Sequence, residues 1–396
     1  MKIGILTHYY NSLNFGGMLQ SYALVAYLKK KGYDAEQVSY AFSSAPFIKP
    51  DIKTDKVQKK HENIVLRLIK RVFRALRFRL IYKPREQFYS NYKKNEIAGR
   101  AESFAKFQNA VPHSEKAFNK ENITAAAENY DCLITGSDQV WNFAWFNPAF
   151  FLDFQNCGAK RIAYAASAGK SVFCDDEKAY LKRTLKEFDA ISVREADLVP
   201  TLNSITETDT TVQTVDPTLL LGAEDWNEIA APRLVKEKYL FCYFLNNDEN
   251  LSKLARKFAK KHKLVIATIP FPGIEYNAED IKFGKYRFDA ADPADFISLV
   301  KYADYVFTDS FHATVFSLLY GKQFLSFPRS DAKSMGSRLL TLTEMFGCKE
   351  RFCCVEVEKR YDYILKLPPY EKNNCTEFEK VKQKSEEFLM KALKNN

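Results

Sequence analysis

The sequence predicts an α/β protein with two domains, each built on a parallel sheet. The chain has 396 residues, which exceeds the roughly 100 to 200 residues of one typical domain. Hydrophobic residues make up 46% and charged residues 27% of the chain, a balance typical of globular proteins with buried cores. Short apolar runs alternate with segments of helical periodicity, and this alternation is typical of a parallel sheet.

The first part of the chain predicts the first sheet. A strand at 2–7 leads through a polar loop into a helix at 18–31, which Gly32 closes. Further strands are expected at 35–40, 132–135, 161–166, 190–193 and 212–215. Together these elements predict an N-terminal α/β domain at 1–225.

After Asp216 and Pro217 the same rhythm starts again. Strands are expected at 239–245, 264–269, 305–308 and 323–327, with a helix at 251–262. This predicts a C-terminal α/β domain at 226–350. A tail at 351–396, with a strand and a charged closing helix at 377–396, is expected to pack across the domains.

An insertion at about 55–110 contains a basic amphipathic helix at 64–81. At about 100° per residue, Val65, Leu68, Ile69, Val72, Leu76 and Leu80 fall on one side, and Arg67, Lys70, Arg71, Arg74 and Arg77 on the other. Two interpretations remain open: packing on its own domain with a solvated basic face, or contact with an anionic membrane surface. Nucleic acid is not an expected partner, because aromatic residues are not interleaved with these charges.

The composition also indicates the cellular compartment of the protein and the charge of its partners. Lys and Arg outnumber Asp and Glu by 59 to 49, giving a net charge of +10 that favours anionic partners. The opening MKIGILTHYY has one positive charge and a short apolar run, unlike a secretory signal. No window approaches the roughly 20 apolar residues of a membrane span, and the eight cysteines lack paired spacing. We therefore expect a cytoplasmic protein.

The segment TDSFHAT at 308–314 gives the sharpest functional signal. Asp309 and Ser310 end an apolar strand, and Phe311 and His312 begin a helix. A helix start points free backbone N–H groups and a positive dipole end toward a bound anion. His312 would then face the crevice at the carboxyl ends of the strands, where open α/β sheets bind ligands.

A second strand, in YDCLITGSDQVWN at 130–142, ends in a cluster of small and polar residues. Asp138 is a candidate general base at this strand end, and Gln139 and Asn142 lie beside it in sequence. Trp141 and Trp145 have two open interpretations, core packing or stacking on a sugar ring.

Two further motifs fit an anion site but are weaker. Arg194, at the end of the strand in ISVRE, either pairs with Glu195 or Glu187 or presents its guanidinium to phosphate or carboxylate. In NFGGMLQSYAL, Gly16 and Gly17 precede a helix, which suits either a tight turn or close approach of a ligand to backbone N–H groups.

Several kinds of site lack their motifs. The chain has no G-x-G-x-x-G, no G-x-x-x-x-G-K-[ST] and no H-E-x-x-H, so dinucleotide binding, P-loop hydrolysis and zincin chemistry have no support. Cys348, Cys353 and Cys354 lack the spacing of a zinc site. We expect no metal and no cofactor.

Taken in order, these segments resemble the polysaccharide pyruvyl transferase family. The resemblance runs through NFGGMLQSYAL, GSDQVWN, RIAYAASAG, ISVRE, VDPTLLL and TDSFHAT, between Lys2 and about Arg338. It implies two Rossmann-like domains facing a cleft, similar to GT-B glycosyltransferases, with the acceptor on the domain at 1–225 and the donor on the domain at 226–350. It also implies transfer of a pyruvyl group from phosphoenolpyruvate, as co-substrate, to two hydroxyls of a sugar, with release of phosphate, in the biosynthesis of exopolysaccharide or another cell surface glycan.

The resemblance also implies roles for individual residues. His312 and Asp138 would be catalytic, with His312 as acid or donor ligand and Asp138 as base. The donor would lie against Arg194, Ser310, Phe311, His312 and Lys322, and the acceptor against Asn14, Gly16, Gly17, Gln20, Gln139, Trp141 and Asn142.

The acceptor would be a glycan or a lipid-linked oligosaccharide, which places the enzyme on the inner face of the cytoplasmic membrane, with residues 64–81 as a membrane contact. Two alternatives remain open from the residues: a GT-B glycosyltransferase that uses a nucleotide sugar, and a non-catalytic sugar-binding relative.

Overall fold

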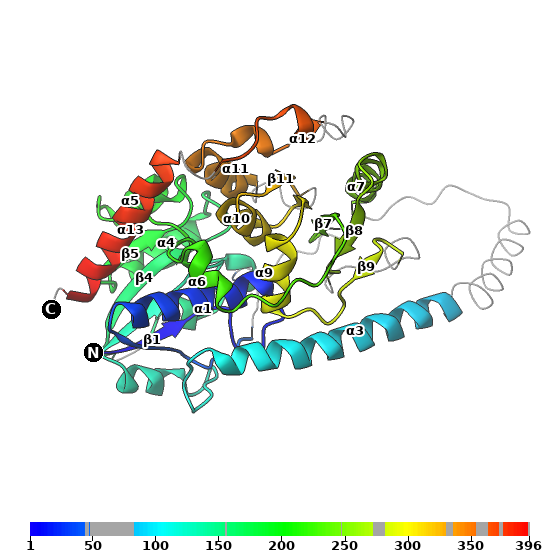
Figure 1. The fold of residues 1–396 in the computed structure, drawn as a ribbon. Helices are drawn as coiled ribbons and strands as arrows, with labels where there is room; N and C mark the ends of the chain where they lie inside the picture. Colours follow the sequence, from blue (N-terminus) through cyan, green and yellow to red (C-terminus); the bar gives the residue numbers. More distant parts are fainter. Residues whose placement is uncertain are drawn as a thin grey trace, which may run out of the picture.

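The computed structural model describes residues 1–43, 47, 83–154, 157–246, 248–271, 282–329, 336–353, 363–371 and 375–394. Within these ranges the chain forms two parallel sheets with helices packed around them (Figure 1). The basic helix expected at 64–81 lies outside the described residues.

The first sheet has the strand order β2-β1-β3-β4-β5-β6, and all of its pairs are parallel. Its strands are β1 (Lys2–Leu6), β2 (Asp34–Gln37), β3 (Cys132–Thr135), β4 (Lys160–Ala166), β5 (Ala190–Val193) and β6 (Val212–Gln213). Ile3 pairs with Ala35 on one side and with Cys132 on the other. The chain therefore reverses its direction of travel across the sheet at β1, and the switch point lies between β1 and β3.

The second sheet has the order β11-β10-β7-β8-β9, again with parallel pairs. Its strands are β7 (Tyr239–Tyr243), β8 (Val265–Thr268), β9 (Tyr286–Arg287), β10 (Tyr305–Thr308) and β11 (Gln323–Ser326). Its switch point lies between β7 and β10, where Leu240 pairs with Tyr305. The sequence did not predict β9, whose two residues are too few to form an alternating pattern.

Helix starts follow polar caps more closely than they follow apolar periodicity. The helices are α1 (Phe15–Lys30), α3 (Lys83–Ala110), α4 (Asp175–Leu185), α5 (Leu198–Thr206), α6 (Ala223–Asn227), α7 (Glu249–Lys261), α9 (Pro293–Lys301), α10 (Phe311–Leu319), α11 (Gly336–Met345), α12 (Tyr363–Lys366) and α13 (Thr376–Lys394). The helix expected from residue 18 begins at Phe15, because the Asn14 side chain accepts a hydrogen bond from Gly17 N. Asp248 likewise caps α7, which begins two residues before the expected start.

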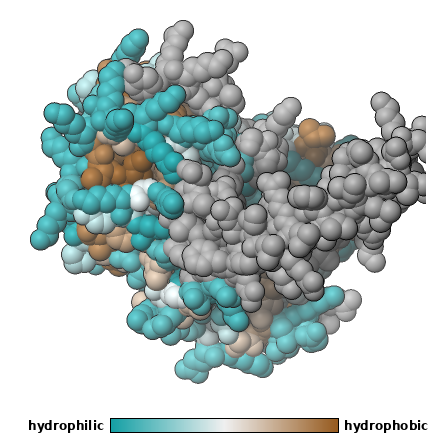
Figure 2. Space-filling model, turned by 90° about the vertical axis from the view of Figure 1, so that its right-hand side faces the viewer, coloured by the Kyte–Doolittle hydropathy of each residue, from teal (hydrophilic) through white to brown (hydrophobic). Residues whose placement is uncertain are grey.

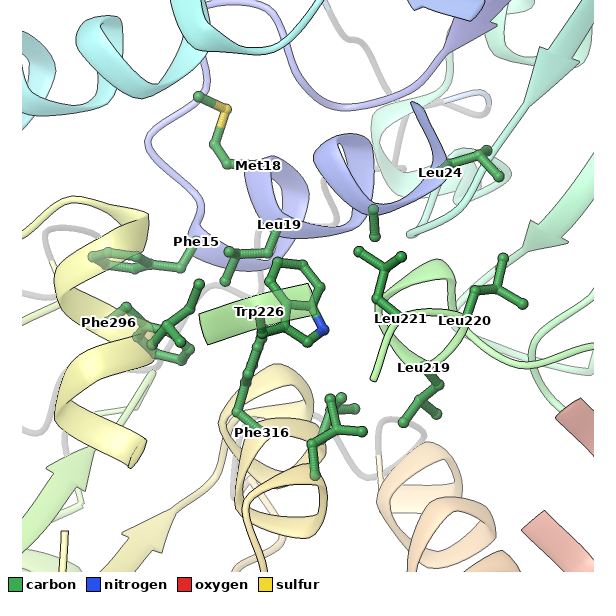
Figure 3. Close-up of a cluster of buried hydrophobic side chains, with 14 of the residues drawn as sticks. Phe15, Met18, Leu19, Leu24, Leu219, Leu220, Leu221, Trp226, Phe296 and Phe316 are labelled. Atoms are coloured by element: carbon green, nitrogen blue, oxygen red, sulfur yellow. The ribbon is translucent and has the colours of Figure 1, made fainter. Parts of the chain in front are cut away.

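An apolar core joins the two halves of the molecule (Figure 3). Trp226 on α6 is fully buried, and its ring meets Phe316 on α10 edge-on with a centroid distance of 4.9 Å. Phe15 on α1 stacks on Phe296 on α9 at 5.0 Å. Because α1 packs on the first sheet and α9 and α10 belong to the second, this core fixes the facing ends of the sheets.

Two long helices also connect the halves (Figure 1). On α3, Arg100 donates a hydrogen bond from Nη2 to the Pro270 carbonyl at 2.7 Å. On α13, the Ser385 hydroxyl accepts from Val215 N at 2.9 Å, and Phe378 stacks on Phe346 at 4.2 Å. The closing helix predicted at 377–396 is thus confirmed as α13.

The surface seen in Figure 2 is hydrophilic over most of its described area, with apolar side chains in a patch at the upper left and at scattered points elsewhere. In the part of the chain that the structure describes, no helix has both the length and the apolar character needed to cross a bilayer.

A candidate active site between the two sheets

The carboxyl ends of β1, β3, β7 and β10 border a cleft of about 100 Å³. Both switch points open onto this place, and switch points are where open α/β sheets bind ligands. The lining residues are Asn14, Gly16, Asp138, Gln139, Tyr243, Leu245, Asp309, Ser310, Phe311, His312, Arg329, Arg338 and Leu339.

His312 lies in the first turn of α10. The Ser310 hydroxyl caps this helix by accepting from Ala313 N at 3.4 Å. The His312 side chain is buried, and its Nε2 lies 3.6 Å from the Asp216 carboxylate. A Cβ at Gly16 would lie only 2.0 Å from His312 Nδ1. Glycine at position 16 therefore lets the start of α1 approach the imidazole from the other half of the molecule.

Arg194 follows β5 and lines a smaller cavity, whose walls it shares with Phe311 and Arg338 of the cleft. Its Nη1 donates to Asp216 Oδ2 at 2.8 Å, and its Nη2 lies 3.7 Å from Asp138 Oδ1. The guanidinium carbon lies 4.5 Å from the centroid of the Phe311 ring. Glu195 is near Nε at 3.9 Å. Within the described residues, however, the buried Nε and Nη2 atoms have no hydrogen-bond acceptor.

Asp216 contacts both His312 and Arg194. It also accepts from Thr218 N at 3.0 Å and from the hydroxyls of Thr218 and Ser137 at 2.7 and 3.2 Å. Burial alone would raise the pKa of Asp216, but His312, Arg194 and Thr218 together lower it well below its usual value. Asp216 is thus a carboxylate. Asp216 lies within the segment VDPTLLL, from which no role for it was predicted.

Asp138 lies on the opposite wall, after β3. Burial would raise its pKa, but the charges of Arg194 and His312 outweigh burial and lower the pKa. A positive φ of 65° turns the chain at this residue. Asp138 is therefore also a carboxylate, and it faces the cleft beside Arg194.

Two arginines of the cleft were not predicted. Arg329 follows β11 and Arg338 lies on α11, and both line the cleft. Arg338 is 8% exposed. Each is a single arginine in a polar stretch of sequence, so no pattern marked it. For Arg329 the available signal is its place just after the strand expected at 323–327; Arg338 lies on a helix and has no such signal.

Two predicted acceptor residues do not reach the cleft. Gln20 is fully buried and donates from Nε2 to the Thr7 hydroxyl and the Gly17 carbonyl, both at 2.9 Å, while its Oε1 accepts from Ser137 N. Trp141 is fully buried and donates from its indole nitrogen to the Phe150 carbonyl at 3.2 Å. Gln20 braces the loops after β1 and β3, and Trp141 has the core role rather than the sugar-stacking role.

Three further predicted residues do not line the cleft either. A Cβ at Gly17 would lie 2.5 Å from the His8 carbonyl oxygen, so backbone packing accounts for this glycine. The Asn142 side chain accepts from Ala144 N at 2.9 Å and contacts the cleft only through Gln139. Lys322 lies before β11, at the opposite end of the sheet, and donates to the Ala303 carbonyl at 3.1 Å. It is not part of the cleft.

One known protein family matches most of the chain. The sequence profile of a family described as polysaccharide pyruvyl transferase matches residues 14–331. No curated protein matches the sequence at a significant level.

Solved structures resemble the whole chain. A UDP-N-acetylglucosamine 2-epimerase from Rickettsia bellii superposes with a TM-score of 0.53 at 10% identity, covering 99% of this chain and 96% of its own. The enzyme of the same name from Methanocaldococcus jannaschii gives 0.50 at 10% identity, with 98% and 100% covered. At such identity the likeness concerns the fold alone. The expected fold, two Rossmann-like domains facing a cleft and similar to GT-B enzymes, is confirmed.

Proposed function

Because the chain belongs to the polysaccharide pyruvyl transferase family, we propose that it transfers a pyruvyl group from phosphoenolpyruvate to two hydroxyls of a glycan sugar. The products are a cyclic ketal and inorganic phosphate. The observation that carries this proposal is the set of buried donors at the start of α10, where Arg194 Nε and Nη2 and His312 Nε2 have no acceptor within the described residues.

Phosphoenolpyruvate fits these donors because it carries only acceptor oxygens on its phosphate and carboxylate. An unsatisfied buried donor costs about 1–3 kcal/mol, and a bound anion removes that cost. The start of α10 adds backbone N–H groups and the positive end of the helix dipole. Arg194 supplies a planar fork, and Asp216 holds that fork and the imidazole in place.

The reaction balances as follows. Carbon C3 of the donor gains one proton as the double bond between C2 and C3 becomes a single bond, C2 forms a bond to each of two hydroxyl oxygens, and the bond between C2 and the phosphate oxygen breaks. Of the two hydroxyl protons, one is balanced by the proton taken up at C3, and the other leaves with phosphate. His312 is the proposed acid and donor ligand, and Asp138 is the proposed base.

The electrostatics of Asp138 restrict how it can act. A carboxylate with a lowered pKa is a weak base, so it cannot deprotonate a free sugar hydroxyl. It can accept the proton while the hydroxyl oxygen is already bonding to C2, since the oxygen then becomes acidic. We therefore propose that proton removal and attack on C2 are concerted.

The proposed activity is tested by phosphate release from phosphoenolpyruvate in the presence of candidate glycan acceptors, with ³¹P NMR of the products. We expect Arg194→Ala and His312→Ala to lower turnover at least about 100-fold, as for loss of a group that stabilises developing charge. Lys322→Ala is the matched control, because it removes a cation outside the cleft, and it should retain turnover. Full turnover by His312→Ala would contradict the proposal.

The main alternative donor is a nucleotide sugar, since the structural relatives are named for UDP-N-acetylglucosamine. Sites for larger ligands usually have about 300–1,000 Å³, whereas this cleft has about 100 Å³. The smaller volume favours a three-carbon donor. A non-catalytic sugar-binding role is distinguished by the absence of phosphate release with every acceptor tested.

We further propose that the enzyme works at the inner face of the cytoplasmic membrane on a lipid-linked acceptor. The support is the alternation of apolar and basic residues at 64–81. Sedimentation with vesicles that contain anionic lipid should show binding that weakens as salt rises. Binding that ignores salt, or no binding, would contradict this contact.

A further inference from the structure

We infer that Arg338 is a second anion-binding residue of this cleft, and that it selects ligands carrying two separate anionic groups over ligands carrying one. The inference rests on the proposed function only for the identity of the natural ligand, phosphoenolpyruvate. Arg194 and the start of α10 bind one anionic group, and Arg338 binds the other.

The first support is the position and burial of Arg338. It is 8% exposed and lines the cleft as well as a smaller cavity of about 20 Å³ that Arg194 also lines. Burial and the charge of Arg194 lower the pKa of Arg338 to about 10. Two guanidinium groups held together away from water repel each other, and an anion between them would offset that repulsion.

The second support is a surplus of donors around Arg338. Its Nε is buried and has no acceptor in the part of the chain that the structure describes. When the Gln139 amide oxygen points toward Arg338, it accepts from Nη1 and Nη2, both at 2.9 Å. In the opposite orientation the same oxygen accepts from Asn142 Nδ2 at 2.7 Å. One oxygen thus faces two sets of donors and cannot satisfy both.

An anionic ligand resolves this conflict. A carboxylate or phosphate offers only acceptors, so it can take the hydrogen bonds of Arg338 while Gln139 turns its oxygen to Asn142. A ligand with a single anionic group is satisfied at Arg194 and α10 and leaves Arg338 as it is. The gain from Arg338 should therefore depend on the second group.

The test is isothermal titration calorimetry with four ligands on the full chain. Phosphoenolpyruvate and 2-phosphoglycolate carry phosphate and carboxylate, whereas allyl phosphate and inorganic phosphate carry one group. For Arg338→Gln we expect at least a 30-fold loss of affinity for both two-group ligands and less than a threefold change for both one-group ligands. Arg338→Lys should fall between, because it keeps the charge without the fork. Lys257→Gln, an exposed cation on α7, is the control.

Equal weakening of both ligand classes would assign Arg338 a merely structural role and overturn the inference. Unchanged affinities in Arg338→Gln would also overturn it, as would a wild type that binds neither two-group ligand. Circular dichroism establishes whether each variant is folded. If Arg338→Gln is not folded, Arg338→Lys is used for the test. The proposed function fails separately: two-group binding that depends on Arg338, without phosphate release, keeps the inference and contradicts pyruvyl transfer. Normal turnover and KM in Arg338→Gln would contradict the inference and leave pyruvyl transfer supported.

Discussion

Asp216 is buried beside the cleft and contacts both side chains that are proposed to hold the donor. Its carboxylate bonds Arg194 at 2.8 Å and lies 3.6 Å from His312, so it orients the two groups proposed to hold the donor. Removing one partner of a buried ion pair costs about 3–5 kcal/mol, because the other charge stays buried and unpaired.

We predict that Asp216→Asn loses about that amount of unfolding free energy in urea at pH 7. Asp175→Asn is the control, since Asp175 forms an exposed pair with Lys178 that should be worth under about 1 kcal/mol. The folded pKa of Asp216 is lowered, so its stabilisation is present above the unfolded value of about 3.9 and is lost as pH falls through the folded pKa. Equal stability of Asp216→Asn and the wild type at pH 7 would refute this account.

Asp309 differs from Asp216 because its pKa is raised rather than lowered. Burial raises its pKa to about 7, although hydrogen bonds from Leu245 N and Asn246 N partly offset burial. The folded state then binds a proton more tightly than the unfolded state. Its contribution to stability should therefore fall as pH rises from about 4 to about 7 and level off above, by at most about 1.4 kcal/mol per pH unit.

Comparing melting temperatures of the wild type and Asp309→Asn across pH 4–9 isolates this contribution, because the other titrating groups are common to both proteins. The wild type should lose stability relative to Asp309→Asn as pH approaches 7. A difference between the two proteins that does not vary with pH would show that Asp309 stays ionised throughout.

Among single residues, the sequence predicted the site residues that directly follow strands. It missed those that reach the cleft from other elements. His312, Arg194 and Asp138 each follow a buried apolar run, and the carboxyl ends of parallel strands share one edge of a sheet. Arg338 reaches the cleft from a helix after a polar segment, which no periodicity marks. Gln20 and Trp141 were assigned to the acceptor because a sequence does not reveal whether a polar or aromatic group is already bonded inside.

Among the elements, the contact between the starts of α1 and α10 matters most for the cleft. Gly16 lies where a Cβ would be 2.0 Å from His312 Nδ1, a distance that side chains cannot tolerate. The imidazole is buried and has little room to move aside. This contact crosses between the two halves, so the register of α1 against α10 determines where His312 points.

We predict that Gly16→Ala displaces His312 and weakens phosphoenolpyruvate binding at least about tenfold, while the protein stays folded. Gly158→Ala is the control, because a Cβ at that exposed glycine meets nothing within 4 Å. Titration calorimetry gives both affinities. Wild-type affinity in Gly16→Ala would mean that His312 does not contact the donor.

Element boundaries could be predicted where local chemistry sets them. The expected strands 132–135, 190–193 and 305–308 coincide with β3, β5 and β10, because polar residues bound each apolar run. The expected strand at 212–215 stops at Gln213: Thr214 N still donates to the Val193 carbonyl of β5, but Val215 N donates to the Ser385 hydroxyl of α13. That contact joins residues far apart in the chain, and local pattern cannot anticipate it.

At the scale of the whole molecule, a shared core makes the two sheets one cooperative unit. Trp226 is fully buried between α1, α10 and the segment around Thr218, to whose carbonyl its indole donates at 3.1 Å. Domains joined by a large apolar interface should not unfold independently. The two parallel sheets were predictable from alternation, whereas this interface was not, because it depends on which helix faces meet.

We predict that Trp226→Ala lowers the free energy of unfolding by about 3–5 kcal/mol, as for other large-to-small changes in a core. Trp145→Ala is the control, because Trp145 is 38% exposed and should change stability by less than about 0.5 kcal/mol. Calorimetry of the wild type should give a single transition. Two separate transitions, or equal effects of the two tryptophan variants, would contradict a shared core.

The central claim is that a cleft between the two sheets binds phosphoenolpyruvate through Arg194 and His312. The most direct measurement is a thermal-shift titration of phosphoenolpyruvate, UDP and GDP on the wild type, Arg194→Ala and His312→Ala. A ligand that binds only the folded state raises stability by about 2.7 kcal/mol at 100 times its Kd. We predict that phosphoenolpyruvate alone stabilises the wild type and that neither variant responds. Stabilisation by a nucleotide but not by phosphoenolpyruvate would contradict the claim and assign the cleft to a nucleotide sugar.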